Sequence, residues 1–211
     1  YDLLLEYDTW VIGAVSLRIE HNLLAPASAN LESIKEVWSH PEALAQCRDF
    51  LSSHPEYKVV SVYDTAGAAK IVKEQKINDV AIIAGPQVAK LYNFKKLKEN
   101  IESHPDNFTR FLIISKNKKI YTGENSRTMF VFGVKNEPGI LFRCLSIFAL
   151  RNIDLTKLES RAVMGKPYEY LFYIDFKGSI EDENCSHAVE TLKEVVTYFK
   201  LLGSYMTKDK E

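Results

Sequence analysis

Thr109-Arg110-Phe111 is the tripeptide whose side chains are best suited to chemistry, because it stands where a polar loop enters an apolar run. A threonine at the entrance to a strand can present its hydroxyl to a ligand while the residues after it are buried. Arg110 can clamp a carboxylate through two N–H groups, or it can form a structural ion pair that faces outward. The tripeptide alone leaves both an anion site and an ordinary loop-to-strand junction open.

Two helix starts supply further candidates for anion binding. Ser39 precedes His40-Pro41, with the serine suited to an N-cap and the proline near the first helical position. Thr65-Ala66 follows Asp64 and precedes small residues, which allow a ligand to approach the backbone. N–H groups at a helix start point outward and favour anions. Plain helix caps without a ligand are the alternative interpretation of both segments.

Metal and nucleotide chemistry are not indicated by the sequence. The five histidines lack ligand spacing with the cysteines or with one another. They are His21, His40, His54, His104 and His187. The sequence contains no Gly-rich phosphate loop or dinucleotide fingerprint. We therefore expect neither a metal nor a cofactor.

Composition limits the kinds of partner that this chain can have. Its 211 residues are 46% hydrophobic and 26% charged, and the formal net charge of -1 provides no broad basic field for nucleic acid or anionic lipid. Cys47, Cys144 and Cys185 are odd in number and widely separated, which favours reduced thiols over a disulfide framework. No apolar run approaches membrane-spanning length. Tyr1-Asp2-Leu3-Leu4-Leu5 is typical of the middle of an amphipathic helix, so we expect the chain to begin part-way through a longer protein.

The elements that must position these residues fall into two parts, separated by a polar stretch at residues 116–127. In the first part, strands are predicted at 11–19, 59–62, 80–84 and 111–115, and helices at 41–51, 66–73 and 86–91. Short apolar strands interleaved with helices indicate an α/β layer architecture with mostly parallel pairing.

The second part has a different order of elements. Strands are predicted at 129–134, 153–161, 168–176 and 201–205, and helices at 139–150 and 186–199. This order, βαββαβ, is that of a ferredoxin-like sandwich.

The motifs occur in the order found in prephenate dehydratases, which the chain resembles over essentially its whole length. In the first part these motifs are Tyr1-Asp2-Leu3-Leu4-Leu5, Ile19-Glu20-His21-Asn22-Leu23-Leu24, Ser39-His40-Pro41, Asp64-Thr65-Ala66-Gly67-Ala68-Ala69-Lys70 and Asn107-Phe108-Thr109-Arg110-Phe111. The second part is similar to the ACT regulatory domain of that family. Its matching segments are Asn136-Glu137-Pro138-Gly139-Ile140-Leu141, Glu159-Ser160-Arg161, residues 168–176 and Leu202-Gly203-Ser204-Tyr205.

The resemblance implies a periplasmic-binding-protein-like α/β catalytic domain over residues 1–117, lacking its N-terminal segment, and a ferredoxin-like ACT domain over residues 127–207. It implies a lyase that decarboxylates and dehydrates prephenate to phenylpyruvate in L-phenylalanine biosynthesis. The catalytic residues implied are Thr109, Arg110 and Phe111. The substrate-binding residues implied are Ser39, His40, Thr65, Ala66 and Asn107.

The resemblance also implies feedback regulation by L-phenylalanine. The effector-binding residues would be Asn136, Pro138, Gly139, Ile140, Leu141, Glu159, Ser160 and Arg161, the last three supplied by a partner subunit of a homodimer or homotetramer. Ala162 stands where the family has proline after Glu-Ser-Arg, which frees the local backbone. The alternative is that Gly139 only starts a helix.

Two further alternatives remain open at the level of sequence. The family's upstream segment, which forms the other wall of the active cleft, is absent from these 211 residues. The first alternative is therefore that the chain is a catalytically incomplete fragment, which acts only as an amino-acid-binding or oligomerisation module. The second alternative is that the chain is an arogenate dehydratase, because the sequence of the Asp64–Lys70 motif resembles the plant-type branch of the family. We expect a cytoplasmic protein, or a plastid stromal one if it comes from a plant.

Overall fold

The chain forms two compact units, which a computed structural model describes at residues 1–163 and 170–207. Residues 17–109 make one unit, here called the α/β unit. Residues 1–16 and the chain from Arg110 onward make the other, here called the ferredoxin-like unit. The chain passes between them within β1 (Trp10–Arg18) and again within β7 (Phe108–Ser115).

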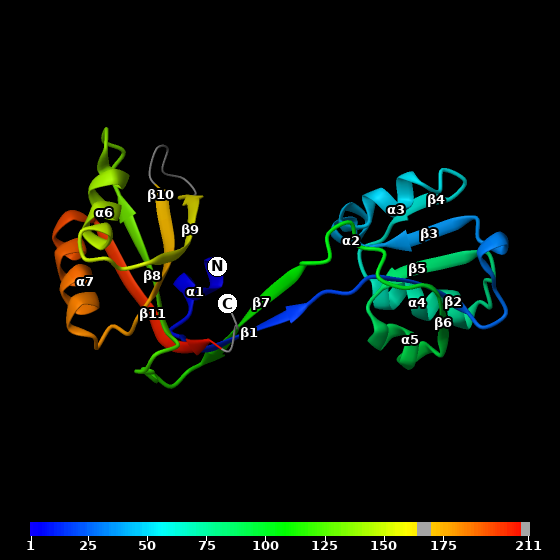
Figure 1. Cartoon of the computed structure of the whole chain (residues 1–211), viewed down its shortest axis with the longest axis horizontal. Helices are drawn as coiled ribbons and strands as arrows, with labels where there is room; N and C mark the ends of the chain where they lie inside the picture. The colour runs from blue at the N-terminus through cyan, green and yellow to red at the C-terminus, as the bar shows by residue number, and fades with distance from the viewer. Residues whose placement is uncertain (164–169, 208–211) are drawn as a thin grey trace. The chain divides into compact units, whose positions relative to one another are not determined.

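The α/β unit has a five-stranded mixed sheet in the order β4-β3-β5-β2-β6 (Figure 1). Its strands are β2 (Asn22–Pro26), β3 (Glu36–Ser39), β4 (Lys58–Ser61), β5 (Val80–Ala84) and β6 (Phe94–Lys98). The pairings of β3 with β4 and β5 are parallel, as predicted. Those of β2 with β5 and β6 are antiparallel, so the prediction of mostly parallel pairing was wrong at this side of the sheet.

Helices cover both faces of this sheet, and every residue of the central strand β5 is therefore buried. Ile83 packs with Val37 and Cys47 on the face of α2 (Pro41–Gln46) and α3 (Arg48–Ser52). Ile82 packs on the opposite face with Val72, on the side of α4 (Thr65–Glu74) and α5 (Pro86–Tyr92). The single helix predicted at 41–51 is divided at Cys47.

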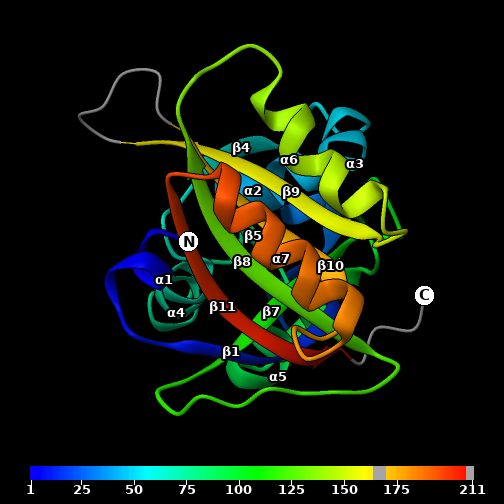
Figure 2. The ribbon, with the colours of Figure 1, turned by 90° about the vertical axis from the view of Figure 1, so that its left-hand side faces the viewer.

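The ferredoxin-like unit has the predicted βαββαβ order. Its elements are β8 (Ser126–Val134), α6 (Ile140–Ala149), β9 (Leu155–Ala162), β10 (Tyr170–Lys177), α7 (Glu183–Val195) and β11 (Tyr198–Thr207). These strands pair antiparallel in the order β11-β8-β10-β9. Figure 2 shows α6 and α7 lying across one face of the sheet, where Phe130, Phe148 and Phe176 form the core. The predicted helix 186–199 ends earlier, and Phe199 belongs to β11.

Two strands that precede the βαββαβ elements in the sequence, β1 and β7, extend this second sheet. Its full order is β7-β1-β11-β8-β10-β9, with β1 parallel to β11. At Gly203 a Cβ atom would lie 2.1 Å from the carbonyl oxygen of Val11, so only glycine allows this approach. The face away from α6 and α7 packs against α1 (Asp2–Glu6) through Leu4, Tyr173 and Tyr205.

The compact units therefore do not follow the predicted domain limits. Residues 1–16 and 110–117, assigned from the sequence to a catalytic domain, pack within the ferredoxin-like unit. Residues 168 and 169 of the predicted strand 168–176 lie outside the described part of the chain. No helix in the described ranges is long and apolar enough to span a membrane.

Candidate functional site

Three predicted substrate-binding residues meet at the carboxyl ends of two parallel strands. Ser39 is fully buried at the end of β3, and its Oγ donates to the carbonyl oxygen of Ile83 at 2.7 Å. The hydroxyl of Thr65 lies 3.4 Å from the Ser39 Oγ and accepts the backbone N–H of His40 at 3.2 Å. The carboxyl edge of a parallel sheet is the usual place for a ligand in α/β proteins.

The helix caps at this edge differ in detail from the prediction. The N-cap of α2 is His40, whose Nδ1 accepts from the backbone N–H of Glu42 at 3.2 Å, and Ser39 is not the cap. The N-cap of α4 is Asp64, whose Oδ1 accepts the backbone N–H of Ala66 at 3.0 Å. The Asp64 carboxylate thus takes the N–H of Ala66 that was expected to face a substrate.

Asn107 is anchored to the end of α2 by the side-chain amide of Gln46, a residue that was not predicted to belong to the site. Its Nδ2 donates to Gln46 Oε1 at 2.9 Å, and the His21 Nε2 lies 2.7 Å from the same oxygen. Because an amide oxygen only accepts, His21 donates from Nε2. Its buried Nδ1 has no hydrogen-bond partner among the described residues. Gln46 stands seven positions after Ser39, within the helix predicted at 41–51, and no local pattern indicates that it contacts Asn107.

Thr109 follows Asn107 by two positions at the start of β7 and is exposed. The carbonyl oxygen of Asn107 accepts the backbone N–H of Ile19 at 2.8 Å, so the backbone just before the threonine is fixed. Phe111 is half exposed, and it lines a cavity of about 490 Å³ in the ferredoxin-like unit with Leu3, Tyr7 and other residues.

Arg110 lies in a structural ion pair, but the pair faces the interior of the ferredoxin-like unit, so the expectation of an outward pair was wrong. Its Nη1 donates to Asp175 Oδ2 at 2.9 Å, and its Nη2 donates to the hydroxyl of Tyr205. Burial raises the pKa of Asp175, and the Arg110 charge and the Tyr205 hydroxyl oppose that rise. Two of the guanidinium's N–H groups are thus engaged within the ferredoxin-like unit.

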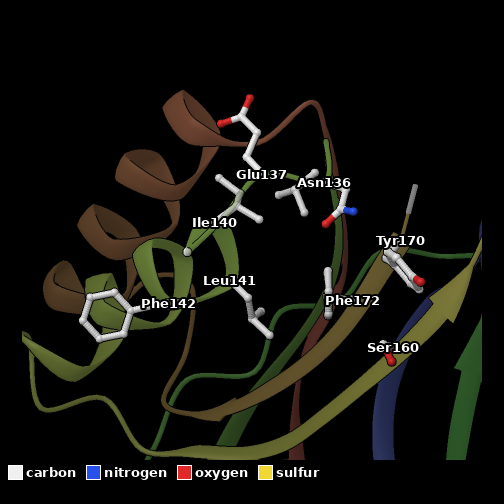
Figure 3. Close-up of a pocket in the computed structure, with 10 residues that line it drawn as sticks. Asn136, Glu137, Ile140, Leu141, Phe142, Ser160, Tyr170 and Phe172 are labelled. Carbon is white, nitrogen blue, oxygen red and sulfur yellow. The ribbon is translucent and has the colours of Figure 1, made fainter. Parts of the chain in front are cut away.

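A pocket of about 310 Å³ in the ferredoxin-like unit gathers most of the predicted effector-binding residues (Figure 3). Asn136, Gly139, Ile140, Leu141 and Ser160 line it, and so do Val134, Glu137, Phe142, Tyr170 and Phe172. Gly139 adopts φ +76° just before α6. Pro138 is not among the lining residues. An apolar pocket with a few polar groups suits a small amphipathic ligand.

Glu159 and Arg161 do not line this pocket, whereas Ser160 does so within its own chain. Ser160 pairs with Phe172, whose ring packs on the α6 side of the sheet. Glu159 pairs with Tyr173 on the α1 side, because successive strand residues face opposite ways. Lys157 at 3.0 Å and Arg161 at 2.5 Å bind the Glu159 carboxylate, and these bonds lower its pKa.

Within the described residues, no group of three or more histidine, cysteine, aspartate or glutamate side chains is arranged to hold a metal ion.

Comparison with known proteins gives consistent matches over the whole chain. The family model described as prephenate dehydratase matches residues 1–119. Prephenate dehydratase of Methanocaldococcus jannaschii is 40% identical over 211 residues, which cover 99% of this chain and 75% of that protein. Arogenate dehydratase/prephenate dehydratase 2, chloroplastic, of Arabidopsis thaliana is also 40% identical, over 97% of this chain. The match covers 56% of the Arabidopsis protein, so the chain spans little more than half of that relative's length.

A solved structure agrees with these sequence matches. Prephenate dehydratase from Arthrobacter aurescens, in complex with L-Phe, superposes with a TM-score of 0.88 at 29% identity. The superposition covers 96% of this chain and 68% of that one.

Proposed function

The chain belongs to the prephenate dehydratase family, and from that premise we propose that it converts prephenate to phenylpyruvate as a lyase. Prephenate loses carbon dioxide from its ring carboxylate and water through its ring hydroxyl, and the product gains an aromatic ring. The enzyme must therefore bind a dianion and help a hydroxyl group to leave. In this proposal residues 1–117 carry the catalysis and residues 127–207 carry the regulation.

The observation that carries the proposal is the placement of Thr109. Thr109 is exposed two positions after Asn107, whose side chain and carbonyl oxygen are both held by hydrogen bonds. A threonine hydroxyl is too weak an acid to be deprotonated fully at neutral pH. Its contribution is a hydrogen bond that strengthens as charge grows on the leaving oxygen.

Ser39, His40 and Thr65 supply the second part of the substrate site in this proposal. Their hydrogen bonds place two hydroxyl groups beside the carboxyl end of β3. Arg110 is left out of substrate binding, because Asp175 and Tyr205 engage two of its N–H groups. Ala66 contributes little through its backbone, since Asp64 accepts its N–H.

L-Phenylalanine is the effector that we assign to the pocket beside α6. Leu141 and Phe172 offer apolar contact, and Asn136 and Ser160 offer polar atoms on opposite sides (Figure 3). The related Arthrobacter protein was solved with L-Phe bound. That Glu159 and Arg161 of a partner subunit complete this site in a homodimer or homotetramer remains our prediction. The compartment, cytoplasmic or plastid stromal, is likewise a prediction.

Turnover by Thr109 variants tests the proposed function. With prephenate as substrate and phenylpyruvate absorbance as the readout, we expect Thr109→Ala to lower kcat by at least about a hundredfold. Thr109→Ser keeps the hydroxyl and is the matched control, with most of the activity retained. If Thr109→Ala keeps more than about a tenth of the wild-type kcat, Thr109 is not the catalytic hydroxyl.

The choice of substrate is tested by the same assay with arogenate. The name of the Arabidopsis relative includes both activities. Phenylalanine formed from arogenate at a higher kcat/KM than phenylpyruvate from prephenate would assign the chain to the arogenate branch. Binding of phenylalanine without turnover of either compound would favour the non-catalytic module.

A further inference from the structure

A cavity of about 360 Å³ lies within the α/β unit, at the edge of the sheet away from the proposed substrate site. Pro26 at the carboxyl end of β2 and Phe94 at the amino end of β6 line it, and these two residues pair with each other. Asn22, at the other end of β2, pairs with Ala84 at the carboxyl end of β5, which is the edge that carries Ser39. The cavity is therefore separate from the site around Ser39.

The buried residues that line this cavity are apolar or aromatic. Val72 is fully buried, and Phe94 is 8% exposed. The half-buried ring of Tyr92 has its centroid 6.2 Å from that of Phe94, with the two planes tilted by 47°. The volume lies near the lower end of the range for ligand pockets, about 300–1,000 Å³. These features suit a small ligand with an apolar or aromatic body.

The exposed rim of the cavity carries two positive charges and no negative one. Lys73 and Lys76 both line it, and the lining includes no aspartate or glutamate. Neither ammonium group forms an ion pair with a residue that the structure describes. The Lys73 Nζ lies 6.0 Å from the centre of the Tyr92 ring. A negative group on a ligand would therefore meet two unpaired lysines beside an aromatic ring.

Helix dipoles account for only part of this positive charge. The last residues of α4 and α5, Glu74 and Tyr92, stand next to or within the lining of the cavity. A helix C-terminus carries about half a negative elementary charge, and its effect falls off within the last turn. Two such ends match one lysine. A net positive charge therefore remains at the rim.

The backbone at Lys76 is in a conformation that favours glycine. Its φ is +53°, and the next residue, Ile77, closes the end of α4 by donating its backbone N–H to the carbonyl oxygen of Val72 at 3.0 Å. Glycine takes this left-handed conformation without strain, whereas a lysine lowers stability there. Backbone strain of this kind clusters at functional sites. The strain at Lys76 is consistent with a use for its charge.

We propose that this cavity binds a small aromatic carboxylate. We call it the lysine pocket and define it by Val72, Lys73, Lys76, Asn78, Tyr92 and Phe94. The aromatic ring of the ligand packs against the buried apolar residues, and its carboxylate lies between the two lysines. Asn78 adds a donor, because its Oδ1 accepts from the Ser28 hydroxyl at 2.6 Å and its Nδ2 group remains available. The proposal does not depend on the dehydratase function.

Titration of the isotope-labelled chain with phenylacetate at low ionic strength tests this proposal. The readout is the backbone amide NMR signals of Lys76 and Asn93, because both residues line the lysine pocket and neither lines the pocket beside α6. We expect both signals to move saturably at millimolar phenylacetate. Phenylacetamide has the same ring without the charge. We expect it to bind roughly twofold to 25-fold more weakly, since each exposed ion pair contributes roughly 1.5-fold to fivefold.

Two substitutions and a matched control locate the binding. Lys73→Gln and Lys76→Gln each remove one charge, and we expect each to raise the dissociation constant for phenylacetate by roughly 1.5-fold to fivefold. The double variant should raise it further. Lys70→Gln is the control, because Lys70 is also on α4, is 63% exposed and pairs with Glu74 at 3.8 Å, but does not line the cavity. We expect an unchanged dissociation constant in Lys70→Gln.

Three results would overturn the proposal. They are unmoved Lys76 and Asn93 signals, equal binding of phenylacetamide and phenylacetate, and a double variant that binds phenylacetate as tightly as the wild type. Phenylpyruvate in the same titration distinguishes two sources of ligand. If it moves the same signals, the product of the proposed reaction can occupy the lysine pocket, and if only phenylacetate does, the pocket takes a different aromatic carboxylate. An inactive chain would contradict the proposed function and leave this titration decisive.

Discussion

Thr109 and Arg110 are neighbours in the chain, but their side chains have opposite surroundings. The threonine is exposed, whereas the arginine contacts a carboxylate that is 2% exposed. Alternation along a strand produces this division, because successive side chains face opposite sides. One residue is thereby available to a substrate and the next is available for anchoring.

The three cysteines give a prediction at the same scale. Burial raises the pKa of the Cys47 thiol to about 12 and that of Cys185 to about 11, and it also raises the pKa of Cys144. At pH 8 the thiolate that attacks a disulfide reagent is therefore scarce in the folded protein. We expect no rapid labelling by the disulfide reagent dithiobis(nitrobenzoate) at pH 8, and three thiols labelled after unfolding in guanidinium. One thiol labelled in seconds in the native protein would contradict this.

At the scale of elements, the pocket beside α6 carries a testable prediction. Leu141 lines it, and Leu150, 82% exposed at the end of the same helix, does not. Burying a leucine side chain contributes about 1.5–3 kcal/mol, so Leu141→Ala should weaken phenylalanine binding by roughly tenfold or more in calorimetry. Leu150→Ala is the control, with an unchanged Kd. Equal Kd values for both variants would place the effector elsewhere.

The close approach of β1 to β11 gives a second element-scale prediction. Gly203→Ala would place a Cβ against the Val11 carbonyl, whereas at Gly139, which also has positive φ, an added Cβ meets nothing within 4 Å. We expect Gly203→Ala to lower the free energy of unfolding by about 1–3 kcal/mol, and Gly139→Ala to lower it less. Denaturant unfolding of both variants measures this. A larger loss for Gly139→Ala would contradict the packing described here.

Strands with a continuous apolar run were predicted well from the sequence, and short strands bounded or interrupted by polar residues were not. The strand 80–84 was predicted with its observed limits, because β5 is buried on both faces. Strands β2, β3 and β6 were missed, because polar residues or a proline bound β2 and β3 and three lysines interrupt β6. The helix 186–199 was extended too far, although Val195, Val196 and Thr197 are β-branched and favour an extended chain.

Several residues of the candidate site could be predicted from the sequence, but the residues that they contact could not. Ser39 and Thr65 were selected as two helix starts, and their contact depends on β3 and β4 pairing in parallel. The partners of Arg110 are 65 and 95 residues away, and no local pattern indicates such pairs. Gln46 and His21 were missed for the same reason.

At the scale of the whole molecule, the proposed catalytic hydroxyl and the proposed effector pocket fall in different compact units. Ser39, Thr65 and Thr109 belong to the α/β unit, and the pocket beside α6 belongs to the ferredoxin-like unit. Regulation then requires that phenylalanine bind two states of the molecule with different affinity. The net charge of -1 offers no long-range attraction for a dianion, so binding depends on local groups.

The most direct test of the central claim is phenylpyruvate formation from prephenate by the purified chain and by Thr109→Ala. We predict turnover by the wild-type chain, a kcat lower by at least about a hundredfold in Thr109→Ala, and unchanged phenylalanine binding in that variant. Turnover by Thr109→Ala at the wild-type rate, or none by a folded wild-type chain that binds phenylalanine, would contradict the claim.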